Sequence, residues 1–266
     1  MTLEPSRHGA AIEANGLGRH FANKWAVRGL DLAIAPGEIY GFLGPNGAGK
    51  TTSIRMLAGM LRPSEGTVRI DGREYGSDPA ALKQIIGLVP DTPPLYEYLT
   101  GRQYIALVAS MWRVDRQTRD ERCDRLLHQL YLNDGAEDLC RSYSHGTRKK
   151  IHIAAILTTA PRVLLLDEPT TGLDPRSARA LKDLMLEESK RGTTILFSTH
   201  VLEAAEQICH RVGILDRGQL KAEGTVAELR AQRGEDSLEA IFLRLTDGGG
   251  DAARPEMENG DGSAAR

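Results

Sequence analysis

The stretch Gly44-Pro45-Asn46-Gly47-Ala48-Gly49-Lys50-Thr51 decides the fold that we expect for this chain. It fits the pattern G-x-x-x-x-G-K-[ST], whose backbone N–H groups surround the phosphates of a nucleoside triphosphate. Residues 38–43 before it are typical of a buried strand, and the residues after it are typical of a helix. Glycines let the backbone approach phosphate oxygens, and the positive end of a helix dipole favours negative charge. We therefore predict that this loop and Thr52 bind a triphosphate, with Lys50 at the β- and γ-phosphates and the Thr51 hydroxyl on Mg²⁺.

A second segment combines an apolar run with two acids. Val163-Leu164-Leu165-Leu166-Asp167-Glu168 lies between two prolines, and its length suits a strand buried on both faces of a parallel sheet. An acid at the end of such a strand needs a partner, and we expect Mg²⁺, bound by Asp167 directly or through water. Glu168 is then placed to polarise the attacking water. The alternative is a strand that merely ends in a solvated acidic turn.

Three further segments narrow the interpretation. Ser144-His145-Gly146-Thr147-Arg148-Lys149-Lys150 opens a helix before the acid-tipped strand, Thr171-Gly172-Leu173-Asp174-Pro175 follows that strand, and Ser198-Thr199-His200 ends the next one. In this order, with the phosphate loop and the paired acids, they resemble the ATP-binding subunits of ABC transporters, most of all those of bacterial two-component exporters. The resemblance runs from about residue 11 to about residue 246, nearly the whole chain.

The resemblance implies roles for residues outside the loop. It places Phe21 where an aromatic ring stacks on adenine, although a lone aromatic residue more often belongs to a core. It makes Asp174 the turn aspartate that bridges the two sites of a dimer. It makes His200 a catalytic residue, beside Lys50 and Glu168, that contacts the γ-phosphate and orients the water. It also implies a signature segment that binds the γ-phosphate of the ATP held by an opposite subunit: Ser144, His145, Gly146 and Thr147.

The chain departs from the family pattern at three positions. Asp91 stands where the family has Gln after a strand, His145 replaces the first signature Gly, and Thr147 replaces a signature Gln. A carboxylate is a better ligand for a hard cation than an amide, so we predict that Asp91 joins Thr51 and Asp167 as ligands of Mg²⁺. The alternative is that Asp91 only caps the turn that follows it.

The implied fold is α/β. It is an ABC-type P-loop ATPase core, with a mainly parallel sheet flanked by helices and an additional antiparallel β layer, and it carries an inserted helical subdomain. Strand-like segments at residues 11–16, 26–34 and 66–71 are assigned to the antiparallel layer. The tail has too few apolar residues to offset the entropy of ordering, so we expect it to be disordered. The expected divisions are a core at 8–92 and 144–230, the helical subdomain at 93–143, a C-terminal helix at 231–246 and the tail at 247–266.

Helical periodicity supports the inserted subdomain. Thr100 and Gln103 form a capping box, which predicts the start of a helix. Asp174-Pro175 and Thr225–Glu228 predict two further helix starts. Two sets of apolar residues at i, i+3, i+4 and i+7 predict helices: Tyr104, Leu107, Val108 and Met111, and then Cys123, Leu126, Leu127 and Leu130.

Composition agrees with a cytosolic subunit of 266 residues and 41% hydrophobic content. We find no apolar run long enough to span a bilayer and no signal peptide. The three cysteines are widely spaced, which fits reduced thiols rather than disulfides or a zinc site. A net charge of −2 gives no broad basic field, so no nucleic-acid partner is expected. Arg148-Lys149-Lys150 is interpreted as a solvated helix face, and the alternative is cationic character beside the bound phosphates.

The predicted function is ATP hydrolysis, dependent on Mg²⁺, that powers an ABC transporter, and we expect the transporter to be an exporter. The partners implied by the resemblance are a separate transmembrane permease subunit, contacted near residues 95–100, and a second ATPase subunit, identical or not. The protein would then lie on the cytoplasmic face of the membrane. The alternative is a soluble ATPase of the same superfamily that acts on ribosomes or DNA.

Overall fold

The structure is a computed structural model that describes residues 9, 11–75, 79–234 and 237–246. Its larger sheet has the strand order β10-β9-β3-β8-β7-β6. Neighbouring strands are parallel except β10, which pairs antiparallel with β9. This confirms the mainly parallel sheet. Its strands are β3 (Ile39–Leu43), β6 (Ile86–Val89), β7 (Val163–Asp167), β8 (Thr194–Thr199), β9 (Arg211–Asp216) and β10 (Gln219–Gly224).

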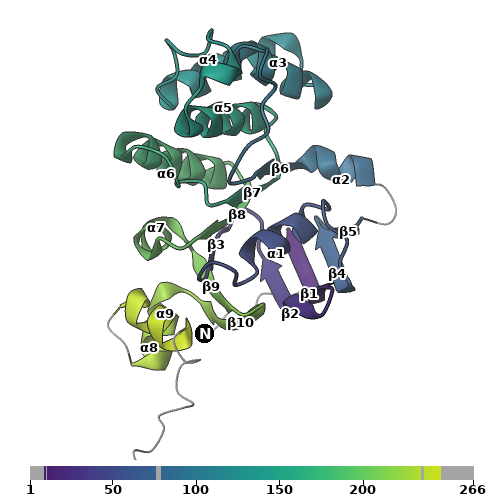
Figure 1. The fold of residues 1–266 in the computed structure, drawn as a ribbon, viewed down its shortest axis with the longest axis vertical. Helices are drawn as coiled ribbons and strands as arrows, with labels where there is room; N and C mark the ends of the chain where they lie inside the picture. Colours follow the sequence, from purple (N-terminus) through teal and green to yellow (C-terminus); the bar gives the residue numbers. More distant parts are fainter. Residues whose placement is uncertain (1–8, 10, 76–78, 235–236, 247–266) are drawn as a thin grey trace, which may run out of the picture.

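A smaller antiparallel sheet lies beside the first, with the order β2-β1-β4-β5 (Figure 1). The predicted antiparallel layer is thus confirmed, with longer first and second strands than the sequence indicated. Helix α1 (Lys50–Leu57) packs between the two sheets, because its buried Ile54 and Leu57 belong to the apolar cluster that joins them. The strands are β1 (Ile12–Phe21), β2 (Lys24–Ile34), β4 (Glu65–Ile70) and β5 (Arg73–Glu74).

Strand β7 is buried on both faces, as its apolar run predicts. Leu164 and Leu166 pack into the cluster formed with the helices of one side. Val163 and Leu165 point the other way, into the cluster of α1 and the antiparallel sheet. Alternate side chains of a strand face opposite sides, so a strand covered on both faces must be apolar throughout.

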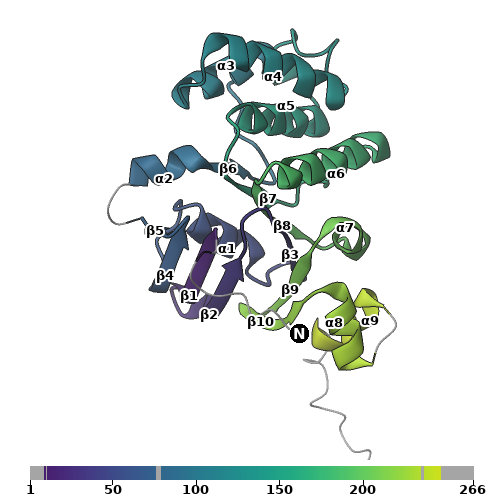
Figure 2. The ribbon, with the colours of Figure 1, turned by 180° about the vertical axis from the view of Figure 1, so that it is seen from behind.

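Helices cover the larger sheet and both ends of the molecule. α6 and α7 lie on the side of that sheet away from α1 (Figures 1 and 2). α6 begins at the predicted N-cap Asp174 with Pro175 as its first residue, and α8 begins at the predicted Thr225 capping box. Besides α1, the helices outside the α3–α5 end of the molecule are α2 (Pro79–Ile85), α6 (Pro175–Lys190), α7 (Leu202–Ile208), α8 (Val226–Arg233) and α9 (Leu238–Thr246).

Three helices form the opposite end of the molecule from α8 and α9, as Figure 2 shows. They are α3 (Gly101–Met111), α4 (Arg116–Gln129) and α5 (His145–Thr158), with a short 3-10 turn at Cys140–Ser142. The capping box of Thr100 and Gln103 is present at the start of α3. All four apolar residues predicted for the second helix, from Cys123 to Leu130, are buried.

The helix that this spacing predicts is present as α3, but only two of its four periodic apolar residues are buried. Tyr104 and Val108 are buried, but Leu107 is 36% exposed and Met111 61% exposed. The helix instead turns Ile105 and Ala109 inward, because its core side packs on α5. Periodicity locates an apolar stripe but does not fix which edge of that stripe meets the neighbouring helix.

The proposed domain boundaries stay predictions, and the tail at 247–266 lies outside the described residues. Within the part of the chain that the structure describes, no helix is long and apolar enough to cross a membrane. The three cysteines are free thiols, and burial raises the pKa of Cys123 to about 11.

Candidate functional site

The phosphate loop connects β3 to α1 and depends on its glycines. Gly47 and Gly49 have φ angles of 81° and 108°, in the left-handed region that favours glycine. A Cβ on Gly49 would lie 2.5 Å from the carbonyl oxygen of Ala26, on strand β2. The loop therefore requires glycine both for its turn and for its approach to the smaller sheet, and α1 starts directly after it.

Lys50 folds back over this loop. It is only 6% exposed, and its Nζ donates to the carbonyl oxygens of Gly44 at 2.6 Å and Pro45 at 3.2 Å. The same Nζ lies 3.5 Å from Oε1 of Glu168. Phosphate oxygens are stronger acceptors than carbonyls, so the ammonium is already placed to exchange these contacts for contacts with an anion.

The two predicted acids lie at the end of β7. The buried Asp167 accepts a hydrogen bond from the Ser198 hydroxyl at 2.6 Å. Glu168 follows with φ of 47°, a left-handed conformation that costs a non-glycine residue about 1–3 kcal/mol. Its backbone N–H donates to the carbonyl of Ser198 at 3.2 Å and to its hydroxyl at 3.1 Å. Backbone contacts therefore maintain the strained geometry that directs the Glu168 side chain.

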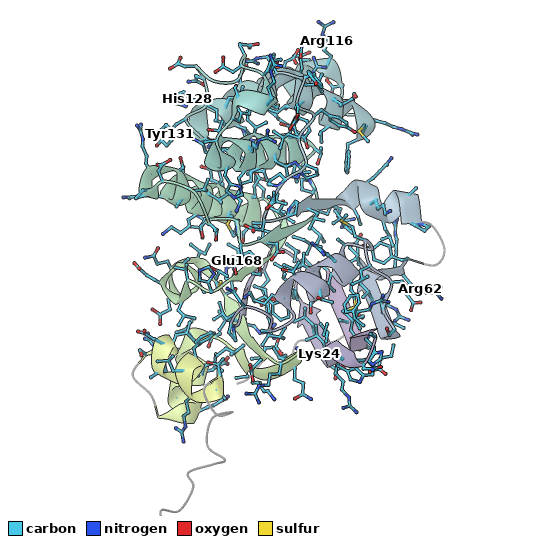
Figure 3. The ribbon with its side chains drawn as sticks, in the orientation of Figure 1. Lys24, Arg62, Arg116, His128, Tyr131 and Glu168 are labelled. Carbon is cyan, nitrogen blue, oxygen red and sulfur yellow. The ribbon has the colours of Figure 1, made fainter. Side chains whose placement is uncertain are left out.

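The Glu168 carboxylate lies between two predicted catalytic groups. Oε2 is 3.0 Å from Nδ1 of His200, and Oε1 faces Lys50. Among the described residues, none makes a hydrogen bond to the buried Oε1. Figure 3 shows Glu168 in the middle of the molecule, between the helices of one end and the smaller sheet that carries Lys24. The Lys50 ammonium, 3.5 Å away, is thus the charged group that faces this buried oxygen.

Two adjoining cavities surround these groups. One of about 280 Å³ is lined by the phosphate loop with Thr51, Asp91, Asp167 and Glu168. The other, of about 430 Å³, is lined by Phe21, Lys24, Trp25 and Arg217, and both share Ala26 and Gly47. Phe21 is 45% exposed, with the Arg19 guanidinium 4.7 Å from its ring centre. Phe21 is therefore no core residue and lies next to the phosphate loop, where its role as a base-stacking ring remains a prediction.

The donors at the first cavity suit a hard divalent cation. Thr51, Asp167 and Asp91 all supply oxygen, the ligand type that Mg²⁺ prefers. Among the described residues, no group of three or more His, Cys, Asp and Glu could hold a metal ion by itself. A cation here would therefore take part of its coordination from phosphates and water, as Mg²⁺ commonly does. Asp91 also accepts a hydrogen bond from Lys149 at 3.0 Å, a partner that neither interpretation of this residue predicted.

The signature residues do not line either cavity. Ser144 is the exposed N-cap of α5, and its hydroxyl accepts from the Thr147 N–H at 3.2 Å. His145 packs on Gly172: a Cβ at Gly172 would lie 2.7 Å from Cδ2 of the histidine. Gly146 in turn approaches the Gly172 carbonyl so closely that its own Cβ would lie 2.6 Å away. The side chain at position 145 is thus accommodated because the opposing turn has none.

Asp174 lies on the same exposed surface. It caps α6 through hydrogen bonds from the Ser177 N–H and hydroxyl, which lower the pKa of its carboxyl group. We call residues 144–147 together with Asp174 the signature surface. The structure thus brings most predicted site residues to one cavity and leaves the signature surface apart from it.

The interpretation of Arg148-Lys149-Lys150 as a solvated face is wrong for two of the three. Lys149 has no exposed surface and Lys150 is 9% exposed. The burial of these two lysines could have been inferred from the rest of α5. That part of the helix is apolar on nearly all sides from Ile151 to Leu157, and a helix of that kind is buried. Sequence reasoning also missed Ser198 as the residue that holds Asp167.

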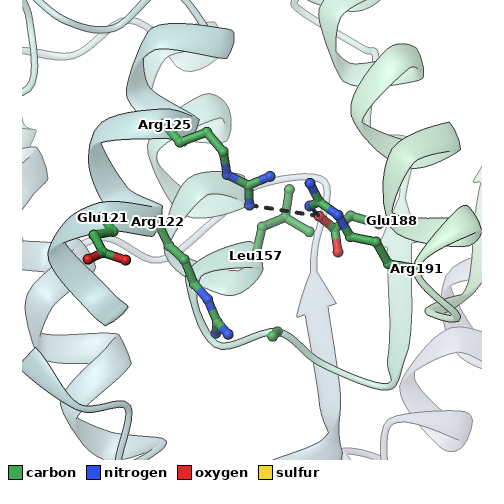
Figure 4. Close-up of a pocket in the computed structure, with 7 residues that line it drawn as sticks. Glu121, Arg122, Arg125, Leu157, Glu188 and Arg191 are labelled. Carbon is green, nitrogen blue, oxygen red and sulfur yellow. Dashed lines mark hydrogen bonds and ion pairs between the residues drawn. The ribbon is translucent and has the colours of Figure 1, made fainter. Parts of the chain in front are cut away.

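Another cavity, of about 420 Å³, lies between α4, the end of α5 and α6 (Figure 4). Arg125 and Arg191 converge there on the buried Glu188, at 4.0 Å and 2.5 Å. No predicted site residue lines it. The Arg125–Glu188 ion pair connects α4 to α6, so we interpret the cavity as structural.

A phosphate loop between a parallel strand and a helix, facing two acids at the end of β7, which lies beyond β8 in the same sheet, defines a P-loop nucleotide-binding protein. The sequence pattern of the family described as "ABC transporter" matches residues 27–171. The daunorubicin resistance ATP-binding protein DrrA3 of Streptomyces coeruleorubidus is 39% identical over 232 residues, 87% of this chain and 73% of that protein. The linearmycin resistance ATP-binding protein LnrL of Bacillus subtilis is 32% identical over 227 residues, 85% of this chain and 73% of that protein.

A solved structure described as an ATP binding subunit of an ABC transporter has a TM-score of 0.84 and 30% identity, covering 88% of this chain and 99% of that one. The chain therefore belongs to the ABC transporter family, as an ATP-binding subunit. The resemblance found in the motifs is confirmed, and so is the ABC-type fold.

Proposed function

We propose that this chain hydrolyses Mg·ATP at a site completed by a second ATPase subunit, and that the hydrolysis drives export through a separate membrane subunit. The observation that supports the proposal best is the convergence of Lys50, Asp167 and Glu168 on one cavity, with His200 in contact with Glu168, while the signature surface faces solvent.

The residues of the cavity have separate tasks in phosphoryl transfer to water. The loop N–H groups and Lys50 hold the β- and γ-phosphates and stabilise the negative charge that develops on them. Glu168 accepts the proton of the water that attacks the γ-phosphorus, and His200, held by its contact with Glu168, orients that water and contacts the γ-phosphate. Thr51, Asp167 and Asp91 would hold Mg²⁺, which supplies charge neutralisation of the phosphates when bound.

The second subunit is needed because the signature surface is half of a site. Ser144 and Gly146 stand at the N-terminus of a 14-residue helix, whose free N–H groups and dipole favour an anion. A second ATPase subunit placed head to tail would bring its own ATP γ-phosphate to this surface. Asp174, exposed on the same surface, would then lie between the two nucleotides.

The membrane partner and the direction of transport are inferred from the relatives and from exposed aromatic residues. DrrA3 and LnrL are named as resistance proteins, against daunorubicin and linearmycin, which supports export. The alternative of a ribosome- or DNA-acting ATPase is not favoured by relatives of this kind. Tyr96 and Tyr98 are 61% and 79% exposed beside the helical end, and exposed aromatic residues favour a protein contact. This contact would hold the protein on the cytoplasmic face of the membrane.

The test is to purify the tagged chain from detergent-extracted cells. We expect a multi-span membrane protein to co-purify, and much less of it with Tyr96→Ala plus Tyr98→Ala. Met60→Ala, which removes a side chain that is 68% exposed elsewhere, is the matched control and should retain the partner. Recovery of ribosomes or DNA in place of a membrane protein would contradict the proposal.

A further inference from the structure

The most unusual polar group of the structure is the ammonium of Lys149. The residue lies on α5 and has no exposed surface. Its Nζ donates to Oδ1 of Asp91 at 3.0 Å, to the carbonyl of Glu168 at 2.9 Å and to the carbonyl of Thr171 at 2.9 Å. An ammonium has three protons, so all its donors are used. A buried charge is otherwise strongly unfavourable, which makes this full set of partners a condition of its burial.

The three acceptors belong to the segments that carry the proposed chemistry. Glu168 is the proposed base, Thr171 lies in the turn that leads to Asp174, and Asp91 lines the cavity of the phosphate loop. The Glu168 backbone is thus held on both sides, by Ser198 at its N–H and by Lys149 at its carbonyl. Because Glu168 has a left-handed φ, removing one of these two restraints would let its backbone relax and redirect its carboxylate.

Lys149 also balances charge at the cavity. Asp91, Asp167 and Glu168 bring three carboxylates to the place where a triphosphate would add more negative charge. The two members of the Lys149–Asp91 ion pair differ in exposure: the Lys149 side chain is fully buried, whereas the Asp91 side chain is half exposed. Asp91 is therefore the acidic partner that offsets the charge of the buried lysine, and the lysine in turn limits how strongly Asp91 repels the γ-phosphate.

We propose that Lys149 is a positioning residue for ATP hydrolysis: it ties the start of the signature helix to the backbone of the base Glu168, to the turn at Thr171 and to Asp91. Through this one group, a displacement of α5 moves the base and the Asp174 turn together. The proposal rests on the proposed function, because it assigns Lys149 a task in that reaction.

The first test separates catalysis from binding. Lys149→Met keeps the length of the side chain and removes the three donors. We expect kcat for ATP to fall by about 10- to 100-fold, since a small misplacement of catalytic groups has effects of this size. The Kd for ATP, measured by direct titration, should change by less than about threefold, because the phosphate loop is untouched. Lys149→Gln, with two neutral donors, should lose less.

The second test needs no activity. The amides of Thr171 and Leu173 are hydrogen-bonded within the turn, to the carbonyls of Glu168 and Thr170, at 3.2 Å each. In Lys149→Met their hydrogen exchange should become at least about tenfold faster as the turn loses its anchor. The matched control is Thr158→Val, which removes another buried hydrogen bond of α5, from the Thr158 hydroxyl to Ala154, far along the same helix.

The results distinguish the two proposals. A loss of kcat no larger than in Thr158→Val, or unchanged exchange at the two amides, overturns the role of Lys149. If Lys149→Met does not fold, Lys149→Gln takes its place in both measurements. A wild-type chain that binds ATP but does not hydrolyse it, even with its membrane partner, refutes the proposed function instead, and the exchange experiment still decides whether Lys149 anchors the turn.

Discussion

The phosphate-loop cavity and the signature surface belong to the same chain but are held in place by different means. The acids at the cavity come from the end of β7 and from the segment after β6, and they are held by partners distant in sequence, such as Ser198 on Asp167 and Lys149 on Asp91. Ser144 and Asp174 at the signature surface are held by local caps, each accepting from an N–H three residues along its own helix. The cavity is therefore organised without a nucleotide. The signature surface consists of two helix starts, and Ser144 and Asp174 there are held by the caps of their own helices.

This difference indicates how the work is divided in a dimer. A pre-formed cavity can bind ATP in a single subunit, because its donors are already oriented and little ordering is needed on binding. The signature surface lines neither of the two cavities at the phosphate loop, so under the proposed function it would act on a nucleotide presented by another subunit. We therefore expect substitutions at the cavity to change binding or chemistry in the single subunit, and substitutions at the signature surface to change only what happens after association.

The largest expected effect is at the base. Glu168→Gln keeps the size of the side chain and removes its ability to accept a proton, so turnover should fall by about 10²–10⁴-fold. ATP binding should persist, and the nucleotide-bound subunits should accumulate as a closed dimer of doubled mass on sizing. Near-normal steady-state hydrolysis would remove Glu168 from this role. Glu239→Gln, an exposed glutamate on α9, should behave as wild type.

The next effect concerns His152, which joins the helical end to the strand leading to Asp91. Its Nδ1 lies 2.7 Å from the Tyr104 hydroxyl and its Nε2 lies 3.1 Å from the Leu88 carbonyl. Burial lowers its pKa from 6.5 to about 4. The unfolded chain therefore binds a proton between pH 6.5 and 4 that the folded chain does not, so acidification through this window should lower the free energy of unfolding by roughly 3 kcal/mol at most.

Denaturant unfolding at several pH values between 7 and 4 measures this contribution. His152→Gln lacks the titrating group and should show a shallower dependence on pH, although a lower stability at pH 7. His128→Gln is the control, because His128 is exposed on α4 and should keep the wild-type slope. Equal slopes in the wild type and in His152→Gln would mean that other groups cause the acid sensitivity.

A smaller effect is expected at Lys50. Lys50→Ala removes the ammonium that faces the cavity and should weaken ATP binding by about 10- to 100-fold, the range for a lost hydrogen bond to a charged group. Titration of ATP into the monomeric protein checks this. Lys182→Ala, on α6 with its ammonium on Gln207, should retain wild-type affinity. Unchanged affinity in Lys50→Ala would contradict the assignment of the phosphate loop.

The smallest effect should appear at the signature surface. Ser144→Ala should leave ATP affinity of the single subunit unchanged and lower hydrolysis by about tenfold, at concentrations where wild-type activity rises faster than linearly with protein. The variant also loses an N-cap, worth about 1 kcal/mol of stability. Thr225→Ala removes a comparable cap on α8 and controls for that loss. Weaker ATP binding in the monomeric Ser144→Ala protein would mean that the signature surface and the cavity are not separate.

The features that could be read from the sequence are those encoded within a few residues. The phosphate loop, the acid-tipped strand β7 and the caps at Thr100, Asp174 and Thr225 depend on neighbours that lie three or four positions away. Strand and helix periodicities act over the same short range, so many of the helices and strands could be predicted, whereas the two sheets were implied by the resemblance to the family. The order of the motifs then indicated the family, which the comparisons confirm.

Features that depend on residues distant in the sequence were decided by packing in three dimensions. Lys149 looked solvated beside Arg148 and Lys150, and it is buried because Asp91, 58 residues earlier, and the turn at Thr171, 22 residues later, meet over it. Leu107 and Met111 are exposed because α3 turns Ile105 and Ala109 to its buried side instead, where it packs on α5. Contacts of this kind are set by how whole elements pack, and no local pattern of residues carries that information.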